Sequence, residues 1–286
     1  MAVCEVCFRH CELQEGQTGF CGARIAKDGR VTAANYGMTT ALALDPIEKK
    51  PLNRFHPGSF ILSTGSYGCN LRCPFCQNYE ISWSDAVKKE QRRADYLSPE
   101  DLAETAAYYQ KDGNIGAAFT YNEPLIGYEY VRDAAKLIHQ KGMVNVLVTN
   151  GTAELKILDE LAPYIDAMNI DLKGFTDRYY REVLKGSRPM VMDFIKRAAT
   201  LCHVELTTLI IPGENDTEEE MDELSRWVSG LPDVYGGRDG SDIPLHISRF
   251  FPRFHMTDRP ATDVRQIYRL VGTASRHLRY VYSGNC

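Results

Sequence analysis

The sequence predicts an α/β protein whose main part is a partial (β/α)6 barrel, preceded by a small cysteine-rich N-terminal extension. From Phe60 to Phe250, short β-prone apolar runs alternate with segments of helical pattern. Such alternation favours a parallel sheet wound with right-handed crossovers, and about six strand–helix units are present. A doubly wound open sheet is the alternative, because periodicity does not distinguish a closed sheet from an open one.

Length, composition and charge limit the classes of function. The chain has 286 residues, enough for one or two domains, and a formal net charge of −5, which argues against a nucleic-acid binder with a broad basic field. No apolar run reaches the roughly 18 residues that a membrane helix needs, and the N-terminus lacks the apolar core of a signal peptide. We therefore expect a cytoplasmic protein without nucleic-acid or membrane partners.

The chain has nine cysteines, an odd number in tight clusters, which in a cytosolic protein indicates metal ligation rather than disulfides. Four of them form a C-x2-C-x3-C-x9-C pattern, namely Cys4, Cys7, Cys11 and Cys21. Four thiolates can hold zinc in a tetrahedron or bind a complete iron–sulfur cluster. We interpret them as a candidate second metal site with a structural role; a metal-free, reduced cap is the alternative.

The rest of the extension, residues 1–59, is expected to hold a hairpin and a linker. Residues 23–37 read as a β-hairpin that turns at Asp28-Gly29. Residues 45–59 are rich in proline and charge and are predicted to link the extension to the domain of residues 60–286.

Within residues 60–286 each element has a local signal. Ser98 is a good N-cap with Pro99 at the first helical position, and Gly113 ends that helix. Strands are predicted at 60–68, 116–121, 144–150, 167–173, 203–211 and 244–250, with an extra edge strand at 278–285. Helices are predicted at 98–113, 125–142, 153–163, 175–184, 187–201, 217–228 and 258–277.

The loop after the first of these strands carries Cys69, Cys73 and Cys76 in a C-x3-C-x2-C spacing. Each thiolate can hold one iron of a [4Fe–4S] cluster, which leaves the fourth iron without a protein ligand and open to a substrate or cofactor. A structural zinc loop is the alternative, but no fourth Cys or His lies nearby; the next candidates are His56 and His139.

Polar side chains follow the other strands at their carboxyl ends, where parallel α/β folds collect their chemistry. They form the candidate site Tyr121, Asn122, Glu123, Thr149, Asn150, Asn169, Asp171, Lys173, His246, Ser248 and Arg249, together with 212–215. We expect a polar mouth over an apolar barrel, with the cysteine loop at its rim.

Five stretches, CNLRCPFCQNYEIS, TYNEP, VLVTNG, MNIDLKG and HISRFFPRF, resemble the AmmeMemoRadiSam-type radical S-adenosylmethionine (SAM) proteins, which are similar to pyruvate formate-lyase activating enzymes. The resemblance covers nearly the whole chain and implies the partial barrel of the radical SAM type. It also implies an anaerobic oxidoreductase that uses a [4Fe–4S] cluster and a low-potential electron donor of the flavodoxin or ferredoxin type. Its reduced cluster would cleave SAM to a 5′-deoxyadenosyl radical that abstracts hydrogen from a substrate.

The resemblance also suggests how the mouth would hold SAM. Glu123 would accept from its ammonium group, Asn169 and Asp171 would hold the ribose hydroxyls, and Lys173 would meet the carboxylate. Phe75 and the apolar edge of Leu209 or Ile211 would flank the adenine. Tyr121, Asn122, Asn150, His246 and Arg249 complete the candidate cofactor- and substrate-binding set. No catalytic side chain is assigned, because the cofactors supply the chemistry.

The substrate is not apparent from the sequence. Activating enzymes usually carry Gly-Gly-Glu-Pro where this chain has Tyr121-Asn122-Glu123-Pro124, which favours another hydrogen abstraction over activation of a glycyl radical enzyme. Phe250, Phe251 and Phe254, with Arg249 and Arg253, would form an aromatic, cationic rim that grips a protein substrate or a small anion. A non-catalytic iron–sulfur or zinc carrier is the alternative from another class. No role is predicted for Cys202 or Cys286.

Overall fold

The computed structural model describes residues 1–83, 87, 91 and 93–286 and contains one large sheet. Its eight strands run in the order β14-β13-β12-β11-β10-β9-β7-β6. Every neighbouring pair is parallel except β6 and β7, which are antiparallel. The strands are β6 (Ala41–Pro46), β7 (Phe60–Gly65), β9 (Asn114–Phe119), β10 (Val144–Thr149), β11 (Ala167–Asp171), β12 (His203–Ile210), β13 (Leu245–Arg249) and β14 (Val281–Gly284).

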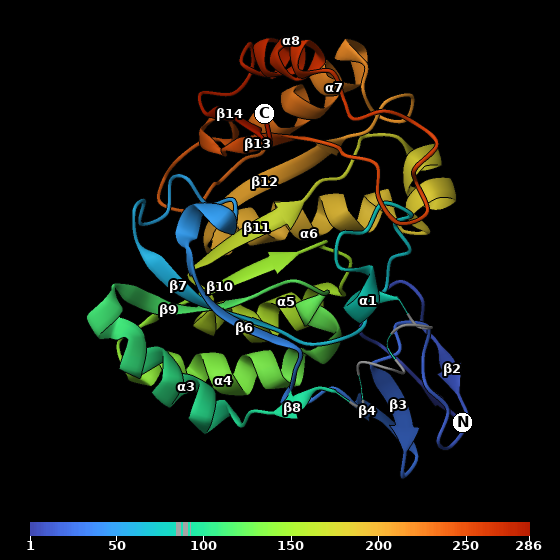
Figure 1. Ribbon diagram of the computed structural model, residues 1–286, viewed down its shortest axis with the longest axis vertical. Coiled ribbons are helices and arrows are strands. Elements are labelled where there is room, and N and C mark those ends of the chain that lie inside the picture. The colour runs from blue at the N-terminus through green and yellow to red at the C-terminus, as the bar shows by residue number, and fades with distance from the viewer. Residues whose placement is uncertain (84–86, 88–90, 92) are drawn as a thin grey trace.

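The edge strands β6 and β14 pair with one neighbour each within the described chain, so the sheet stays open as a partial barrel and the predicted fold class is confirmed. Helices connect the parallel strands and lie along the outer side of the sheet, with α3 and α4 at one end and α7 and α8 at the other (Figure 1). They are α3 (Pro99–Tyr108), α4 (Tyr128–Gln140), α5 (Leu155–Leu161), α6 (Arg188–Leu201), α7 (Glu218–Ser229) and α8 (Val264–Ala274), with short α1 (Tyr79–Ser82) beside the cysteine loop.

The helix ends follow their sequence signals. The side chain of Ser98 accepts a hydrogen bond from the Asp101 N–H at the start of α3, and Gly113 ends the following turn with φ 85°. The helix predicted at 258–277 begins only after Asp263, whose side chain caps Arg265 N–H. The helix predicted at 175–184 is a single π-helical stretch, Tyr179–Leu184.

Three small antiparallel pairs make up most of the N-terminal extension and its contact with the chain that follows. They are β1 (Ala2–Val3) with β2 (Glu12–Leu13), β3 (Arg24–Lys27) with β4 (Arg30–Ala33), and β5 (Met38–Thr39) with β8 (Asp95–Tyr96). The β3–β4 hairpin turns at Asp28 and Gly29, both with positive φ, as its sequence predicts.

The linker predicted at 45–59 is wrong. Residues 41–46 form β6, which pairs with β7 along its whole length, and the next residues plug the barrel interior. Ile47 and Leu52 are fully buried there against Ile61, Ala118, Val146 and Ala167, which lie at the inner bottom of four strands. Proline and charge misled the prediction because Lys50 is itself buried and paired with Asp45. The domain boundary at residue 59 remains a prediction, although the large sheet already begins at β6.

Most of the remaining apolar side chains pack in one cluster between the sheet and its helices. Within the described residues, no helix is both long enough and apolar enough to cross a membrane. Because residues 47–52 fill the barrel at the amino ends of the strands, open space is left at their carboxyl ends.

Candidate functional site

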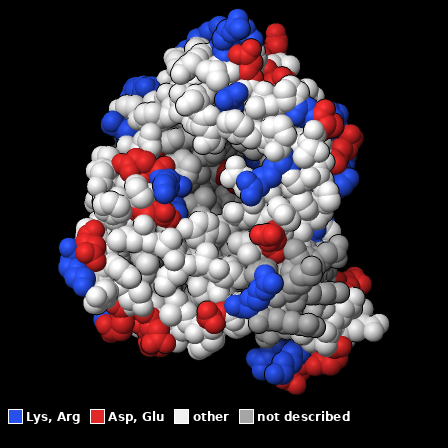
Figure 2. Space-filling model, in the orientation of Figure 1, with Lys and Arg blue, Asp and Glu red and all other residues white. Residues whose placement is uncertain are grey.

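The cysteine loop, residues 68–76, follows β7 at the carboxyl edge of the sheet. Cys69, Cys73 and Cys76 all line one cavity of ≈ 470 Å³ in the barrel mouth. Backbone hydrogen bonds hold the loop from three sides: the N–H groups of Cys69 and Arg72 donate to Cys21 and Leu184, and Pro74 accepts from residue 255. The molecular face drawn in Figure 2 is hollowed near its centre, with charged side chains of both signs around the opening.

The surroundings of the three thiols act on their ionisation in opposite directions. Burial raises the pKa of Cys69, Cys73 and Cys76, while the ammonium of Lys173 opposes that rise at Cys73 and Cys76. Leu71 N–H and the Asn150 amide nitrogen lie 3.4 and 3.7 Å from Cys69 Sγ. These donors and the cation would stabilise sulfur atoms that have lost their protons.

In the described part of the chain, no three His, Cys, Asp or Glu side chains are arranged to hold a single metal ion. The three loop thiols still fit a [4Fe–4S] cluster, because its thiolates sit on separate irons and lie farther apart than ligands of one ion. With three thiols as its donors, such a cluster would keep one iron without a protein ligand.

Glu123 lies beside the start of the cysteine loop, where its N–H donates to the Gly68 carbonyl at 3.4 Å, and it is almost fully buried. One carboxylate oxygen accepts from the Thr149 hydroxyl at 2.7 Å and from Leu125 N–H at 3.1 Å; the other accepts from Asn150 N–H at 2.8 Å. Burial raises the pKa of Glu123 to about 7 in spite of these bonds. One acceptor position remains, and a cationic group in the cavity would satisfy it.

Asp171 and Lys173 form an ion pair at the end of β11, with Nζ 2.7 Å from Oδ2, and both line the cavity. Burial alone would lower the pKa of Lys173, but the Asp171 carboxylate beside it raises that pKa, so the ammonium is charged. Asn215 fixes this strand end, because its amide donates to the carbonyl oxygens of Lys173 and Leu209. The mouth therefore offers one carboxylate and one ammonium side by side.

Tyr121 and Asn122 form the wall nearest β6. Tyr121 has φ 71°, an uncommon conformation for a bulky residue, and its hydroxyl donates to Asp45 at 2.9 Å. Lys50 donates to the same Asp45 oxygen at 2.8 Å. Burial opposes ionisation of Asp45, yet these bonds lower its pKa to about 2. Asn122 instead clamps the chain before Cys69, since it accepts from Ser66 N–H and donates to the Gly68 carbonyl.

Eight predicted binding residues thus line the one cavity: Phe75, Tyr121, Asn122, Glu123, Asn150, Asp171, Lys173 and Leu209. Sequence reasoning missed Lys49 and Lys50, which reach the mouth from the segment after the unpredicted β6, and Asn285, which reaches it just after β14. It also missed Thr207, whereas Ser248, one of the polar residues expected at the strand ends, does line the cavity. Their alternation along β12 and β13 with residues that face the helices was the available signal.

Four other predicted residues lie outside the cavity lining, which corrects their placement. Asn169 sits one layer deeper, where it donates to the Pro51 carbonyl and accepts from Thr207. His246 is bonded to buried Glu205 at 2.7 Å. Ile211 is fully buried in the core just past the end of β12. Arg249 points away from Ser248, donates to the Thr262 carbonyl and covers the Phe251 ring.

The three aromatic residues of the predicted rim lie in different surroundings. Phe250 is a core residue that packs edge-on against Phe75 at 6.5 Å between ring centroids. Phe251 is about half exposed, and Phe254 stacks on Tyr79 of α1 at 4.2 Å. Of the three predicted rim residues, Phe254 is therefore the one that contacts α1, the helix that follows the cysteine loop.

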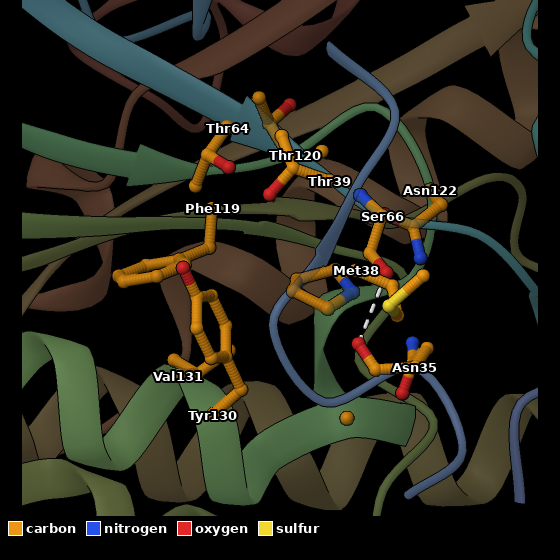
Figure 3. A pocket seen from close by; sticks show the side chains of 13 residues that line it. Asn35, Met38, Thr39, Thr64, Ser66, Phe119, Thr120, Asn122, Tyr130 and Val131 are labelled. Carbon is orange, nitrogen blue, oxygen red and sulfur yellow. Dashed lines mark hydrogen bonds between the residues drawn. The ribbon is translucent and has the colours of Figure 1, made fainter. Parts of the chain in front are cut away.

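A second, small cavity of ≈ 30 Å³ lies behind the mouth and shares Thr120 and Asn122 with its lining. Figure 3 shows Tyr130 and Val131 of α4 on one side and Thr64 on another, with Ser66 bonded to the Asn35 carbonyl. Its volume suits a few water molecules rather than a substrate. It follows that the larger cavity is the candidate site.

The four N-terminal cysteines also come together. Cys4, Cys7, Cys11 and Cys21 line a cavity of only ≈ 10 Å³ against the cysteine loop, and all nine cysteines of the chain are free of disulfides.

Comparison with known proteins agrees with this geometry. The family model described as the Radical SAM superfamily matches residues 64–227. An uncharacterized protein of Methanocaldococcus jannaschii is 38% identical over 286 residues, covering 99% of this chain and 80% of its own length. The pyruvate formate-lyase 1-activating enzyme of Escherichia coli K12 is 25% identical over 173 residues, covering 58% of this chain and 68% of that enzyme.

Two solved structures share the fold. A domain of a pyruvate-formate lyase-activating enzyme from Bacteroides vulgatus superimposes with a TM-score of 0.51 at 17% identity, covering 59% of this chain and 99% of that one. Streptococcus suis SuiB bound to S-adenosylmethionine gives a TM-score of 0.58 at 12% identity over 77% of this chain and 48% of SuiB.

Proposed function

This chain belongs to the radical SAM superfamily, and on that premise we propose that it is an enzyme that uses SAM to abstract hydrogen from a substrate. Cys69, Cys73 and Cys76 bind a [4Fe–4S] cluster, and SAM lies beside it in the barrel mouth. The observation that carries the proposal is the shared cavity of ≈ 470 Å³, in which three thiols face Glu123 and the Asp171–Lys173 pair. A cavity of this size is typical of cofactor sites.

Cys69, Cys73 and Cys76 would hold the cluster, which when reduced would supply one electron for the cleavage of SAM to methionine and a 5′-deoxyadenosyl radical, and this radical would abstract the substrate hydrogen. The residues of the chain bind, orient and exclude water. Glu123 accepts from the ammonium group of SAM with its remaining acceptor position. Asp171 accepts from the ribose hydroxyls and Lys173 donates to the carboxylate. Phe75 and Leu209, both at the cavity wall, flank the adenine.

A direct test is anaerobic reconstitution with iron and sulfide, followed by strong reduction in the presence of SAM. We expect 5′-deoxyadenosine and methionine by mass spectrometry, and no product from the Cys69→Ala/Cys73→Ala/Cys76→Ala variant. A non-catalytic carrier has no reason to bind or cleave SAM, so an inactive, cluster-loaded wild type would support that class instead. The physiological reductant is proposed to be a flavodoxin or ferredoxin in the cytoplasm.

For the substrate, we propose a hydrogen abstraction other than activation of pyruvate formate-lyase. An activase must admit a glycine-bearing loop, whereas Tyr121 stands in the mouth, held by Asp45, where the activating enzymes carry glycine. The relatives that activate pyruvate formate-lyase favour the alternative. EPR of the reduced enzyme with SAM and pyruvate formate-lyase decides between them: we expect no glycyl doublet, and a doublet proportional to the enzyme would establish the activase.

A further inference from the structure

We infer that Cys4, Cys7, Cys11 and Cys21 bind one zinc ion as a closed tetrathiolate centre, and that this centre supports the loop that carries Cys69. The site is separate from the proposed SAM cavity and lies on the other side of the cysteine loop.

The local backbone has the form of a metal knuckle. Cys7 and Cys11 are separated by a tight turn in which the N–H of His10, with φ 38°, donates to the Cys7 carbonyl at 3.2 Å. The Cys4 N–H donates to the Cys11 carbonyl at 2.9 Å, which brings the first and third cysteines together. Gly19 lies close to Cys11, because a β-carbon at that position would lie 3.7 Å from the Cys11 sulfur, an ordinary contact distance.

Hydrogen-bond donors surround the sulfur atoms. Arg9, Arg24 and Asn70 all line the small cavity that the four cysteines enclose. Arg24 Nε is buried without a hydrogen-bond partner among the described residues, and Arg24 lines the cavity of sulfur atoms. Neutral thiols are weak acceptors, whereas thiolates on a metal would satisfy these donors.

Charge and size favour one divalent ion over a cluster. Four thiolates and one Zn²⁺ leave a charge of −2, and Arg9 lines the same cavity; Arg24 lines it too, but its guanidinium is paired with Glu129 at 2.7 Å. Arg9 donates to the carbonyls of Asn70 and Lys185, so its charge is not spent on a carboxylate there. At ≈ 10 Å³ the cavity holds about one water-sized atom, far less than the eight atoms of a [4Fe–4S] core. Among the described residues, no three sulfur atoms are already arranged around one point. Binding of the zinc ion therefore requires small rotations of the thiol side chains.

The same centre touches the barrel mouth. Cys21 contributes the carbonyl that accepts from Cys69 N–H at 3.2 Å. Asn70, which lines the same small cavity as Cys7, accepts from the Asn150 amide at 3.0 Å, and that amide reaches Cys69 Sγ. Displacing the knuckle therefore displaces the first ligand of the cysteine loop.

The first test measures metal in the full-length chain after anaerobic purification, by mass spectrometry of zinc and iron. We expect one zinc per chain in the wild type and in Cys69→Ala/Cys73→Ala/Cys76→Ala. Iron in that triple variant would place a cluster at the N-terminal cysteines and overturn the assignment. So would a metal-free preparation whose four thiols are alkylated by iodoacetamide.

The second test does not depend on a variant that folds. Replacement of zinc by Co²⁺ in the wild type should give the thiolate charge-transfer bands and the strong visible bands of a tetrahedral tetrathiolate. Cys4→Ser and Cys21→Ser should weaken the charge-transfer bands, while Cys286→Ser, at the exposed end of the chain, should leave them unchanged. A six-coordinate spectrum without thiolate bands would overturn the zinc site.

The support of the loop rests on the proposed cluster, whereas the zinc measurements do not, so their failures are distinguishable. The reconstituted wild type, with zinc bound, should be compared with the reconstituted Cys4→Ser/Cys21→Ser variant, and iron loss followed by absorbance. We expect the iron to leave the variant roughly tenfold faster than the zinc-loaded enzyme, as for loss of an outer contact of a metal ligand. Equal rates would overturn the supporting role and leave the zinc site standing.

Discussion

The two cysteine groups touch through one backbone hydrogen bond yet lie in unlike surroundings. Three of the four N-terminal cysteines are buried, and all four enclose a cavity of ≈ 10 Å³. The three loop cysteines face ≈ 470 Å³ lined by carboxylates and lysines. Metal sites with four protein ligands and no access hold structure together, while sites with an open position bind substrates. Cysteine count and accessible space therefore separate a supporting role from a reactive one within a single chain.

Removing the three cysteines of the loop, which face the open cavity, should have the largest effect. Cys69→Ala/Cys73→Ala/Cys76→Ala should abolish the cluster absorbance, its EPR signal and SAM cleavage, while circular dichroism stays native. The fold should survive because the barrel is held by its sheet and core, and the variant keeps Leu71 and Phe75, the loop residues that pack in that core. Retention of a cluster that cleaves SAM in this variant would contradict the assignment of the reactive role to the three loop cysteines.

The junction between the groups gives the next largest effect. Gly68 has φ +91°, and an added β-carbon would lie 2.6 Å from the Cys21 carbonyl oxygen. Gly68→Ala should therefore lower the free energy of unfolding by about 2–4 kcal/mol, from backbone strain and overpacking together. Gly29→Ala is the matched control, because Gly29 has φ +75° and open space, and should cost about 1 kcal/mol. Equal losses in the free energy of unfolding, measured by denaturant titration, would show that the close contact with Cys21 does not affect stability.

Charge in the open cavity should control SAM affinity. Glu123→Gln and Asp171→Asn each remove a charge-assisted hydrogen bond, typically worth about 1.5–3 kcal/mol, so calorimetry should find roughly ten- to a hundredfold weaker binding. Glu220→Gln is the control: its carboxylate is also partly buried and accepts from Phe175 N–H, but it lies outside the cavity. Unchanged affinity in both cavity variants would move the SAM site.

A smaller effect follows from the pKa of Glu123, which burial raises to about 7. Only the ionised carboxylate attracts an ammonium group, so SAM affinity should rise roughly tenfold from pH 6 to pH 8 as the ionised fraction grows. Binding below pH 7 should be accompanied by proton release, visible as a buffer-dependent binding enthalpy. The dependence of SAM affinity on pH should vanish in Glu123→Gln. If it persists in that variant, another titrating group is responsible.

Much of the fold and of the candidate site could be predicted from the sequence. Strand–helix alternation predicted the sheet, and the spacing of Cys69, Cys73 and Cys76 predicted the loop at its edge. The depth at which each side chain lies within the barrel could not be predicted from the sequence. Asn169 and Asp171 share one face of β11, and only the stagger of neighbouring strands decides that Asp171 reaches the cavity while Asn169 bonds to Pro51 below it.

The other failure concerned the segment before the first predicted strand. Its prolines and charges resemble those of a linker, but the charges neutralise each other inside the fold, as in the pair of Lys50 with Asp45. Pairing of β6 with β7 also depends on contacts between strands, which local patterns do not report. Lys49 and Lys50 were therefore missed as parts of the mouth.

The knuckle of the extension has a consequence for the order of events during synthesis. Its bonds between Cys4 and Cys11 and between Gly19 and Arg24 join residues close in the chain, so they need nothing downstream. Chains emerge N-terminus first at about 5–20 residues per second, which gives the first four cysteines a few seconds before Cys69 leaves the ribosome. The two sets of thiols are thus separated in time as well as in space, and the early set can close before the late set is able to mispair with it or compete for its metal.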